Sequence, residues 1–347
     1  MNLKKVVFGV LGIGLVGVAM FSYYIYSVML VPNTAFNSKE AFIFIPSNAS
    51  YQDVREDLEP LLLNMETFDA LAKQKQYSSN VKPGRFRISK GMTNNDIINS
   101  IRSENLPVTV AFNNQHSLPQ LAERISGQIE ADSLSLMQAF TDDEFLNANG
   151  FTTQTALAMY LPNSYEFFWN SSAESFRSKL LKNYKAFWNT NRLEKAKTLG
   201  LSPIQVSILA AIVQEETKQR SEQPRVAGVY LNRLKNNWAL QADPTLKYAA
   251  YQTEAYRKTV IKRVLNKHKK IDSPYNTYRY KGLPPGLIAM PDLHTIDAVL
   301  NFEKHDYFYF AADFRRPGFH RFATTLSEHN RNAKRYQNYL NRKGIRK

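Results

Sequence analysis

A stretch from Val6 to Pro32 is uncharged and mainly apolar, which restricts this part of the chain to a membrane helix or a cleaved signal peptide. A helix needs about 20 such residues to cross the hydrocarbon core of a bilayer. The stretch is longer than the usual apolar core of a signal peptide, and no small-x-small cleavage site closes it. We therefore predict a retained membrane anchor over residues 6–32.

The residues around this stretch predict its orientation. Lys4 and Lys5 precede it and favour a cytoplasmic location for residues 1–5. Three aromatic side chains near its other end suit the outer membrane interface, and they are Tyr23, Tyr24 and Tyr26. We expect a single crossing of the inner (cytoplasmic) membrane, with the chain after about residue 33 outside the cytoplasm. Residues 33–40 are expected to form a short polar linker.

The composition excludes several classes of function. The chain has 45 Lys and Arg against 30 Asp and Glu, a formal charge of +15, and no cysteine. The charge suggests anionic surroundings, but the basic residues are scattered, so nucleic acid is not an expected partner. The lack of cysteine excludes disulfides, thiolate metal sites and cysteine nucleophiles. None of the six histidines belongs to an HExxH-type pair, and there is no nucleophile elbow or Gly-rich phosphate loop, so neither a metal nor a cofactor is expected.

The pattern of apolar residues predicts an α+β protein with two domains after the anchor. Residues 40–105 have the pattern strand, helices, strand, helix, which is typical of a small α+β module. Residues 106–342 are expected to form a larger, mixed α+β domain, whose most informative motifs lie between residues 202 and 330.

Three features of the larger domain are predicted in more detail. Residues 161–168 are expected to form an aromatic loop, and the basic stretch 258–270 a solvated helix face. Residues 307–310 and 319–322 predict a pair of strands, which a final helix follows.

The clearest helix start lies at Ser202, which can cap a helix that begins at Pro203, with Gln205 three residues after the cap. At about 100° per residue, the apolar residues of this helix spread over one broad arc. They are Val206, Ile208, Leu209, Ile212 and Val213. Glu216 falls near the middle of the same arc, and Glu215 lies at its edge. A carboxylate on an apolar face near a helix C-terminus is unfavourable, so either the helix turns outward there or the residue has a chemical role.

Acid–base catalysis is the chemistry that a glutamate in such a place can perform. Burial disfavours the charged form and raises the pKa, so the side chain can act as a general acid near neutral pH. Cleavage of a glycosidic bond requires such an acid, and ordinary glycosidases add a second carboxylate. Glu215 lies about 100° round the helix from Glu216 and cannot readily face it across a substrate. Asp243 is the other candidate, but its position before Pro244 is explained by an N-cap role.

Six motifs, in order along the chain, resemble the YceG-like family of endolytic murein transglycosylases. They are Ala211–Thr217, Val229–Leu234, Leu240–Thr245, Tyr275–Tyr278, Gly282–Gly286 and Thr325–Asn330. The module at 40–105 is similar to that family's LysM-like domain, through Pro83–Phe86 and Gly91–Thr93. The family's catalytic glutamate, which precedes a threonine, falls on Glu216. The loop at Leu161–Tyr165 departs from the family's Phe-Pro-Asp-Thr-Tyr.

The resemblance implies a lytic transglycosylase that cleaves between N-acetylmuramic acid and N-acetylglucosamine within nascent peptidoglycan strands. Glu216 would protonate the linking oxygen and then accept the proton of the muramyl 6-hydroxyl as this closes onto C1, giving a 1,6-anhydro end. Seven residues are expected to bind the glycan: Asn232, Arg233, Gln241, Asp243, Thr245, Asn276 and Tyr278. The implied partners are glycan strands, the lipid bilayer and, through the family's role as a terminator of nascent strands, the peptidoglycan synthases.

Alternatives remain open at this level. The polar residues have a second explanation as helix caps or loop staples. Two other functions fit the sequence as alternatives. The first is a hydrolytic muramidase that uses a water positioned by Glu216 or Asp243, and the second is a non-catalytic peptidoglycan-binding scaffold.

Overall fold

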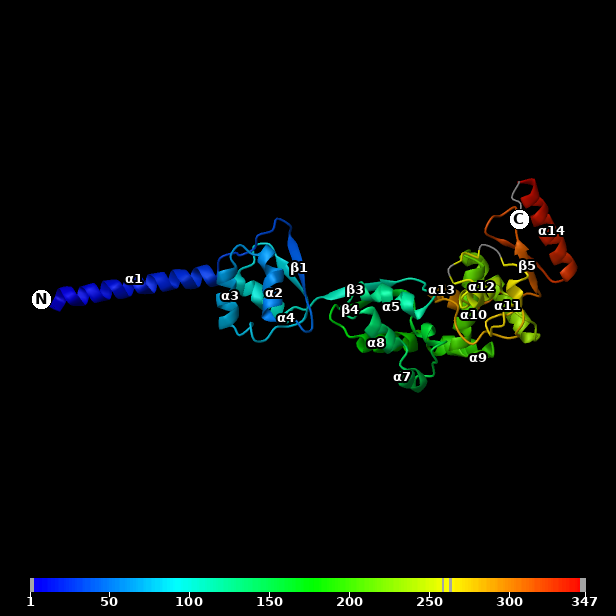
Figure 1. Cartoon of the computed structure of the whole chain (residues 1–347), viewed down its shortest axis with the longest axis horizontal. Coiled ribbons are helices and arrows are strands. Elements are labelled where there is room, and N and C mark those ends of the chain that lie inside the picture. The colour runs from blue at the N-terminus through cyan, green and yellow to red at the C-terminus, as the bar shows by residue number, and fades with distance from the viewer. Residues whose placement is uncertain (1–2, 258, 262–263, 344–347) are drawn as a thin grey trace. The chain divides into compact units, whose positions relative to one another are not determined.

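The computed structural model describes residues 3–257, 259–261 and 264–343, and the chain is a mixed α+β protein (Figure 1). It divides into two compact units. Unit 1 contains residues 1–110, 126–131 and 165–172, and unit 2 contains the rest of the chain. The strands β3 (Pro107–Phe112) and β4 (Asn163–Phe168) form a two-stranded sheet, and the boundary between the units passes through both strands.

Unit 1 begins with one long apolar helix, α1 (Leu3–Met29). The segment Val7–Met29, 23 residues long, is apolar enough to cross a membrane and is not buried against protein. The end of the helix is different, because Val28 is only 3% exposed and belongs to the hydrophobic core of the following module. The side chain of Asn94 donates a hydrogen bond to the Val28 carbonyl oxygen at 2.9 Å. The helix is thus joined to the module by packing as well as by the chain.

The polar linker predicted at 33–40 is wrong at its start. Asn33 is buried, and its side chain donates to the side chain of Asn94 at 2.6 Å and accepts from the backbone of Asn64 at 2.7 Å. Thr34 forms an antiparallel bridge with Leu62. These contacts make the residues directly after α1 part of the module, because the amide of an Asn side chain can donate and accept hydrogen bonds at once.

The module itself is an antiparallel pair of strands covered by helices. Its strands are β1 (Glu40–Ile45) and β2 (Gly84–Ser89), and its α-helices are α2 (Tyr51–Leu58), α3 (Met65–Gln74) and α4 (Asn94–Ser103). Alternate strand residues, such as Ile43 and Ile45, point into the core, as the period of two in a strand requires. Ser50 and Thr93 start α2 and α4 with complete capping boxes. The order strand, helices, strand, helix is as predicted.

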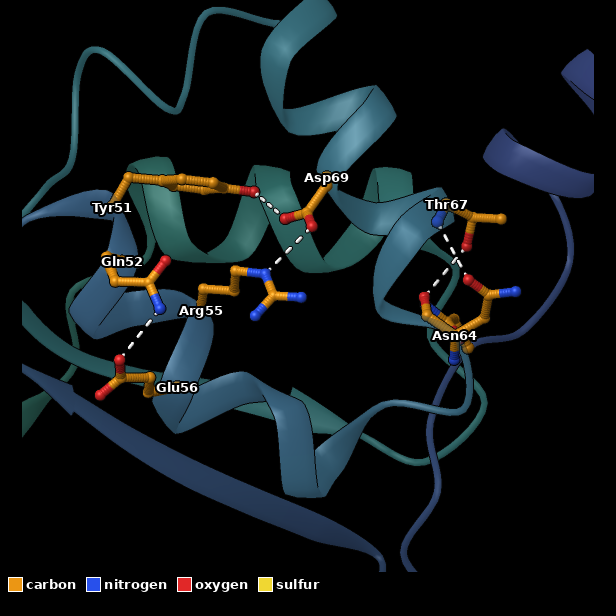
Figure 2. A network of polar contacts seen from close by, with 8 residues as sticks. Tyr51, Gln52, Arg55, Glu56, Asn64, Thr67 and Asp69 are labelled. Carbon is orange, nitrogen blue, oxygen red and sulfur yellow. Dashed lines mark hydrogen bonds and ion pairs between the residues drawn. The ribbon is translucent and has the colours of Figure 1, made fainter.

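A polar network fastens α2 to α3 on the outside of this core (Figure 2). Asp69 accepts hydrogen bonds from the Tyr51 hydroxyl at 2.6 Å and from Arg55 Nε at 3.1 Å. Burial and the bond to Asp69 raise the pKa of Tyr51, so its hydroxyl remains a donor. At the start of α3, the side chain of Asn64 caps the helix by accepting a hydrogen bond from the backbone N–H of Thr67.

Unit 2 is mostly helical. Its α-helices are α5 (Leu118–Ser126), α6 (Ser133–Phe140), α7 (Asp143–Ala148), α8 (Ala173–Phe187), α9 (Thr190–Thr198), α10 (Pro203–Glu216), α11 (Gln223–Lys235), α12 (Asp243–Tyr251), α13 (Leu293–Leu300) and α14 (Leu326–Arg342). The predicted strand pair is present as β5 (Tyr309–Ala312) and β6 (His320–Ala323), which pair antiparallel and carry α14.

The helix α10 is the centre of unit 2. Ser202 caps it with a complete capping box that includes Gln205, as predicted. Every residue from Val206 to Gln214 is buried, so the helix is enclosed rather than buried along one arc. The helices α9, α11, α12 and α13 all pack against it. The amide oxygen of Gln214 accepts hydrogen bonds from the backbone N–H of Asp292 and from the hydroxyl of Thr295, at the start of α13.

Two sequence predictions for this unit need correction. The expected aromatic loop at 161–168 contains the strand β4, because Asn163–Phe168 pairs with β3. Part of the basic stretch 258–270, namely residues 258, 262 and 263, lies outside the described residues. In its described part the helical element is a single 3-10 turn, His268–Lys270, and His268 is buried rather than solvated.

Candidate functional site

Glu216 is the last residue of α10, and its carboxylate is held by a residue of the next helix. The backbone becomes extended at Thr217, which has φ −141° and ψ 131°. The hydroxyl of Tyr230, a buried residue on α11, donates a hydrogen bond to Glu216 Oε1 at 2.7 Å. Glu216 is therefore oriented by one strong donor, while part of its side chain remains accessible.

The surroundings of Glu216 raise its pKa from an ordinary value of 4.5 to about 7. Burial is the largest cause, and the negative charge of Asp243 acts in the same direction. The hydrogen bond from Tyr230 has the opposite effect because it stabilises the ionised form. With a pKa near neutrality, Glu216 can both donate and accept a proton, which general acid–base catalysis requires.

Glu216 opens into a cleft of about 710 Å³, which lies entirely within unit 2. The end of α10 supplies Glu215 and Glu216 to its lining, and the chain before and within α5 supplies His116 and Gln120. One face of α12 completes the wall, because its cleft residues recur three and four residues apart along the helix. They are Asp243, Pro244, Lys247, Tyr248 and Tyr251.

Asp243 lines the same cleft, and its structural role differs from the predicted one. The N-cap of α12 is Ala242, which makes no side-chain cap, and Asp243 is the first residue of the helix. Its carboxylate instead accepts a hydrogen bond from the Tyr278 hydroxyl at 2.6 Å. Burial and this bond raise the pKa of Tyr278, so that the hydroxyl stays protonated. The structure thus brings Glu216, Asp243 and Tyr278 together.

The other predicted glycan-binding residues mainly bond to the protein's own backbone. Asn232 donates to the carbonyl oxygens of His305 and Tyr307 at 2.7 and 3.0 Å, and it lines a different hollow. Arg233 is buried and donates to the carbonyl oxygens of Phe308 and Leu240. Both residues fasten α11 to the segment that leads into β5.

The remaining three residues of this set hold the turn before α12 and the loop over residues 269–277. Gln241 adopts a positive φ of 50°, and its N–H donates to the Thr277 carbonyl oxygen at 3.0 Å. The hydroxyl of Thr245 bonds to the Thr277 hydroxyl at 2.8 Å, and both residues are buried. Asn276 donates to the carbonyl oxygens of Lys269 and Ile271. A role of these residues in binding glycan stays a prediction.

Sequence reasoning missed a buried carboxylate, Glu222, which contacts the residue directly after Glu216. Glu222, which is 5% exposed, accepts hydrogen bonds from the Thr217 hydroxyl at 3.3 Å and from the backbone N–H of His320 at 2.8 Å. Its other contact is with Nδ1 of His320, at 2.8 Å. It also missed Tyr230, whose hydroxyl donates a hydrogen bond to Glu216 Oε1. The available signal was a hydroxyl-bearing side chain among the apolar residues of a helix, since a buried hydroxyl has a hydrogen-bond partner in most structures.

Within residues 3–257, 259–261 and 264–343, no group of three or more His, Asp or Glu side chains is arranged to hold a metal ion. The site thus consists of an acid of raised pKa, a second carboxylate in the same cleft and two tyrosine donors. This set of groups, on a fold with a buried central helix, is typical of an enzyme that transfers protons to and from a substrate.

Comparison with known proteins identifies the family. A profile of the YceG-like family matches residues 43–335, and the chain belongs to this family. A relative from Bacillus subtilis (strain 168), an endolytic murein transglycosylase, is 28% identical over 320 residues, covering 87% of this chain and 86% of the relative.

Further relatives agree in family. An endolytic murein transglycosylase of Streptococcus pneumoniae serotype 2 (strain D39 / NCTC 7466) is 25% identical over 352 residues. The match covers 92% of this chain but 62% of that longer protein. A crystal structure of a YceG-like protein from Listeria monocytogenes has a TM-score of 0.56 at 25% identity, and the match covers 85% of this chain and 99% of that one.

Proposed function

We propose that this protein is a lytic transglycosylase that cuts peptidoglycan strands internally, with Glu216 as the catalytic acid and base. The observation that carries the proposal is the half-buried carboxylate of Glu216, whose pKa is raised to about 7 at the wall of an open cleft. The names of the relatives from Bacillus subtilis and Streptococcus pneumoniae supply the substrate and the reaction class.

In the reaction, Glu216 first donates one proton and then accepts one. Protonated Glu216 donates its proton to the oxygen between N-acetylmuramic acid and N-acetylglucosamine, and the bond from that oxygen to muramyl C1 breaks. The substrate's own N-acetyl group stabilises the positive charge that develops at C1. The Glu216 carboxylate then accepts the proton of the muramyl 6-hydroxyl, whose oxygen bonds to C1. The result is a 1,6-anhydro end without consumption of water, and a pKa near 7 suits a group that must serve in both states.

The remaining parts of the chain fit an enzyme that works close to a membrane. The apolar α1 has the length and composition of a membrane anchor, with residues 1–5 in the cytoplasm and the chain after about residue 33 outside it. The module at 40–105 would be a LysM-like domain, and residues 106–342 the catalytic domain. Cleavage of strands as they are synthesised would make the protein a terminator of polymerisation and the peptidoglycan synthases its neighbours.

Hydrolysis is the second candidate, because Asp243 lies in the same cleft as Glu216. A water positioned between the two carboxylates could attack C1 in place of the 6-hydroxyl, as in glycosidases that use paired carboxylates. The two reactions give different products, since a hydrolysed end is heavier than an anhydro end by one water molecule.

The decisive experiment is digestion of purified peptidoglycan by the full-length protein in detergent, followed by mass analysis of the products. We expect anhydro-muramyl ends, and reducing ends in their place would contradict the transglycosylase proposal. Glu216→Gln should reduce the rate by about 10²–10⁴-fold. The matched control is Glu215→Gln, which removes the neighbouring carboxylate, bonded to Lys218 at 3.0 Å, and should keep most of the activity. If Glu216→Gln cleaves like the wild type, the protein uses another acid, and if the wild type does not cleave at all, the protein is a binding scaffold.

A further inference from the structure

Two cationic side chains line the same cleft as Glu216, at its other end. Lys247 lies on α12 and Arg257 on the turn that follows this helix. Neither forms an ion pair with any carboxylate among the described residues, although several carboxylates elsewhere in unit 2 are paired. Lys247 is partly buried, and Arg257 is exposed. The cleft therefore contains two positive charges that the protein itself does not neutralise.

The helix α12 sets the spacing between the acidic and the basic end. Asp243, Lys247 and Tyr251 recur four residues apart and share one face of the helix. At 1.5 Å per residue, Lys247 lies about 6 Å and Tyr251 about 12 Å along the axis from Asp243. The charge in the cleft thus changes from negative beside Glu216 to positive within one to two helical turns.

Arg257 is held at this end by backbone bonds of its turn. Its N–H donates to the Thr253 carbonyl oxygen at 3.1 Å. The N–H of Ile261 donates to the hydroxyl of Tyr251 at 3.1 Å, which ties the segment after the turn back to α12. Such ties reduce the conformational entropy that ligand binding would otherwise cost.

We propose that Lys247 and Arg257 bind the carboxylates of the arm on C3 of the muramyl ring, which consists of the lactyl group and its stem peptide. This inference rests on the proposed function, because it places the scissile bond at Glu216. When muramyl C1 lies there, C3 of the same ring is two ring atoms away, and its arm can extend along the cleft to the basic end. In the reversed direction the arm would extend away from Lys247 and Arg257, so the charge pattern favours one direction of the strand.

The test measures binding of strands to full-length protein that carries Glu216→Gln, so that the ligand is not cleaved. Three ligands are compared: peptide-bearing strands, the same strands with every carboxylate converted to a neutral amide, and strands freed of peptides, in which cleavage of the amide bond to the stem peptide exposes the lactyl carboxylate. We expect the peptide-bearing strands to bind about tenfold more tightly than the amidated ones, since two partly exposed charge pairs each contribute a few-fold. The preference should shrink as salt is raised.

Two variants with equal loss of charge separate a cleft effect from general attraction. Lys247→Gln with Arg257→Gln should remove the preference, whereas Lys182→Gln with Lys197→Gln, on exposed surfaces of α8 and α9, should retain it. If peptide-free strands bind like peptide-bearing ones, one carboxylate at the lactyl position is sufficient for binding, and if they bind like amidated ones, the carboxylates of the stem peptide are the ligands. Both results support the proposal.

Equal binding of native and amidated strands would overturn the inference, as would an equal loss of preference in the control variant. Failure of the proposed function would be seen separately, because wild-type protein would then yield no anhydro-muramyl ends. Thermal melts of both double variants, compared with the parent, show whether either change affects folding.

Discussion

Replacing the ionisable Glu216 by glutamine should stabilise the protein at alkaline pH. The carboxyl group has a pKa of about 7 in the folded protein, against 4.5 when it is free of these surroundings. Between these values the native state retains a proton that the unfolded state has lost. The free energy of unfolding therefore falls as pH rises through this window, and above pH 7 the full cost of burying the charge is present. Glutamine has the shape of the protonated acid and never carries that charge.

The magnitude follows from the two pKa values. A difference of about 2.5 between folded and unfolded pKa corresponds to about 3.4 kcal/mol at most, since each pKa unit is worth about 1.36 kcal/mol. Because the cleft is open to water, we expect about 1–3 kcal/mol at pH 8 and almost nothing at pH 4.5. For a domain of this size that is about 2–10 °C in melting temperature.

The assay is thermal unfolding of full-length wild type and Glu216→Gln in the same detergent at pH 4.5 and pH 8. Glu215→Gln serves as the control, because its carboxylate faces Lys218 at the edge of the site and its loss should not give the same pH-dependent gain. A Glu216→Gln protein that is no more stable than wild type at pH 8, or that differs equally at both pH values, would refute the reasoning.

Two further changes test the surroundings of Glu216 and the attachment of α1 to the module that follows it. Tyr230→Phe removes the hydrogen-bond donor that lowers the pKa of Glu216. The alkaline limb of the pH profile of kcat/KM should therefore move up by as much as about one pH unit. A limb that stays in place would show that the hydroxyl has no influence on the acid. Asn94→Ala removes hydrogen bonds to Val28 and Asn33. It should lower the free energy of unfolding of unit 1 by about 2–4 kcal/mol in urea and expose the chain after α1 to protease. Unchanged protease cleavage there would contradict the packing of the end of α1 against the module.

Local patterns in the sequence were sufficient for several features of the fold. The length of the apolar run predicts α1. The cap at Ser202 predicts where α10 begins, because capping depends on residues within one turn. Helical geometry alone set Glu216 apart from Glu215. Each of these signals lies within one element, so it can be read without knowing what packs against that element.

The site depends on contacts between elements, which only the tertiary structure decided. Tyr230 reaches Glu216 from 14 residues away, Tyr278 reaches Asp243 from 35, and His320 reaches Glu222 from 98. Asp243 has the sequence context of a cap but contributes its carboxylate to a cleft. Asn232 has the chemistry of a sugar ligand but satisfies backbone carbonyls.

The physical reason is that hydrogen-bonding capacity is a property of a residue, while its partner is a property of the packing. By itself the sequence determined the apolar helix α1, the cap at Ser202 and a carboxylate in an unfavourable position. The packing of α11 and α12 around the end of α10 determined that this carboxylate has a donor at 2.7 Å, a pKa near 7 and an open cleft in front of it.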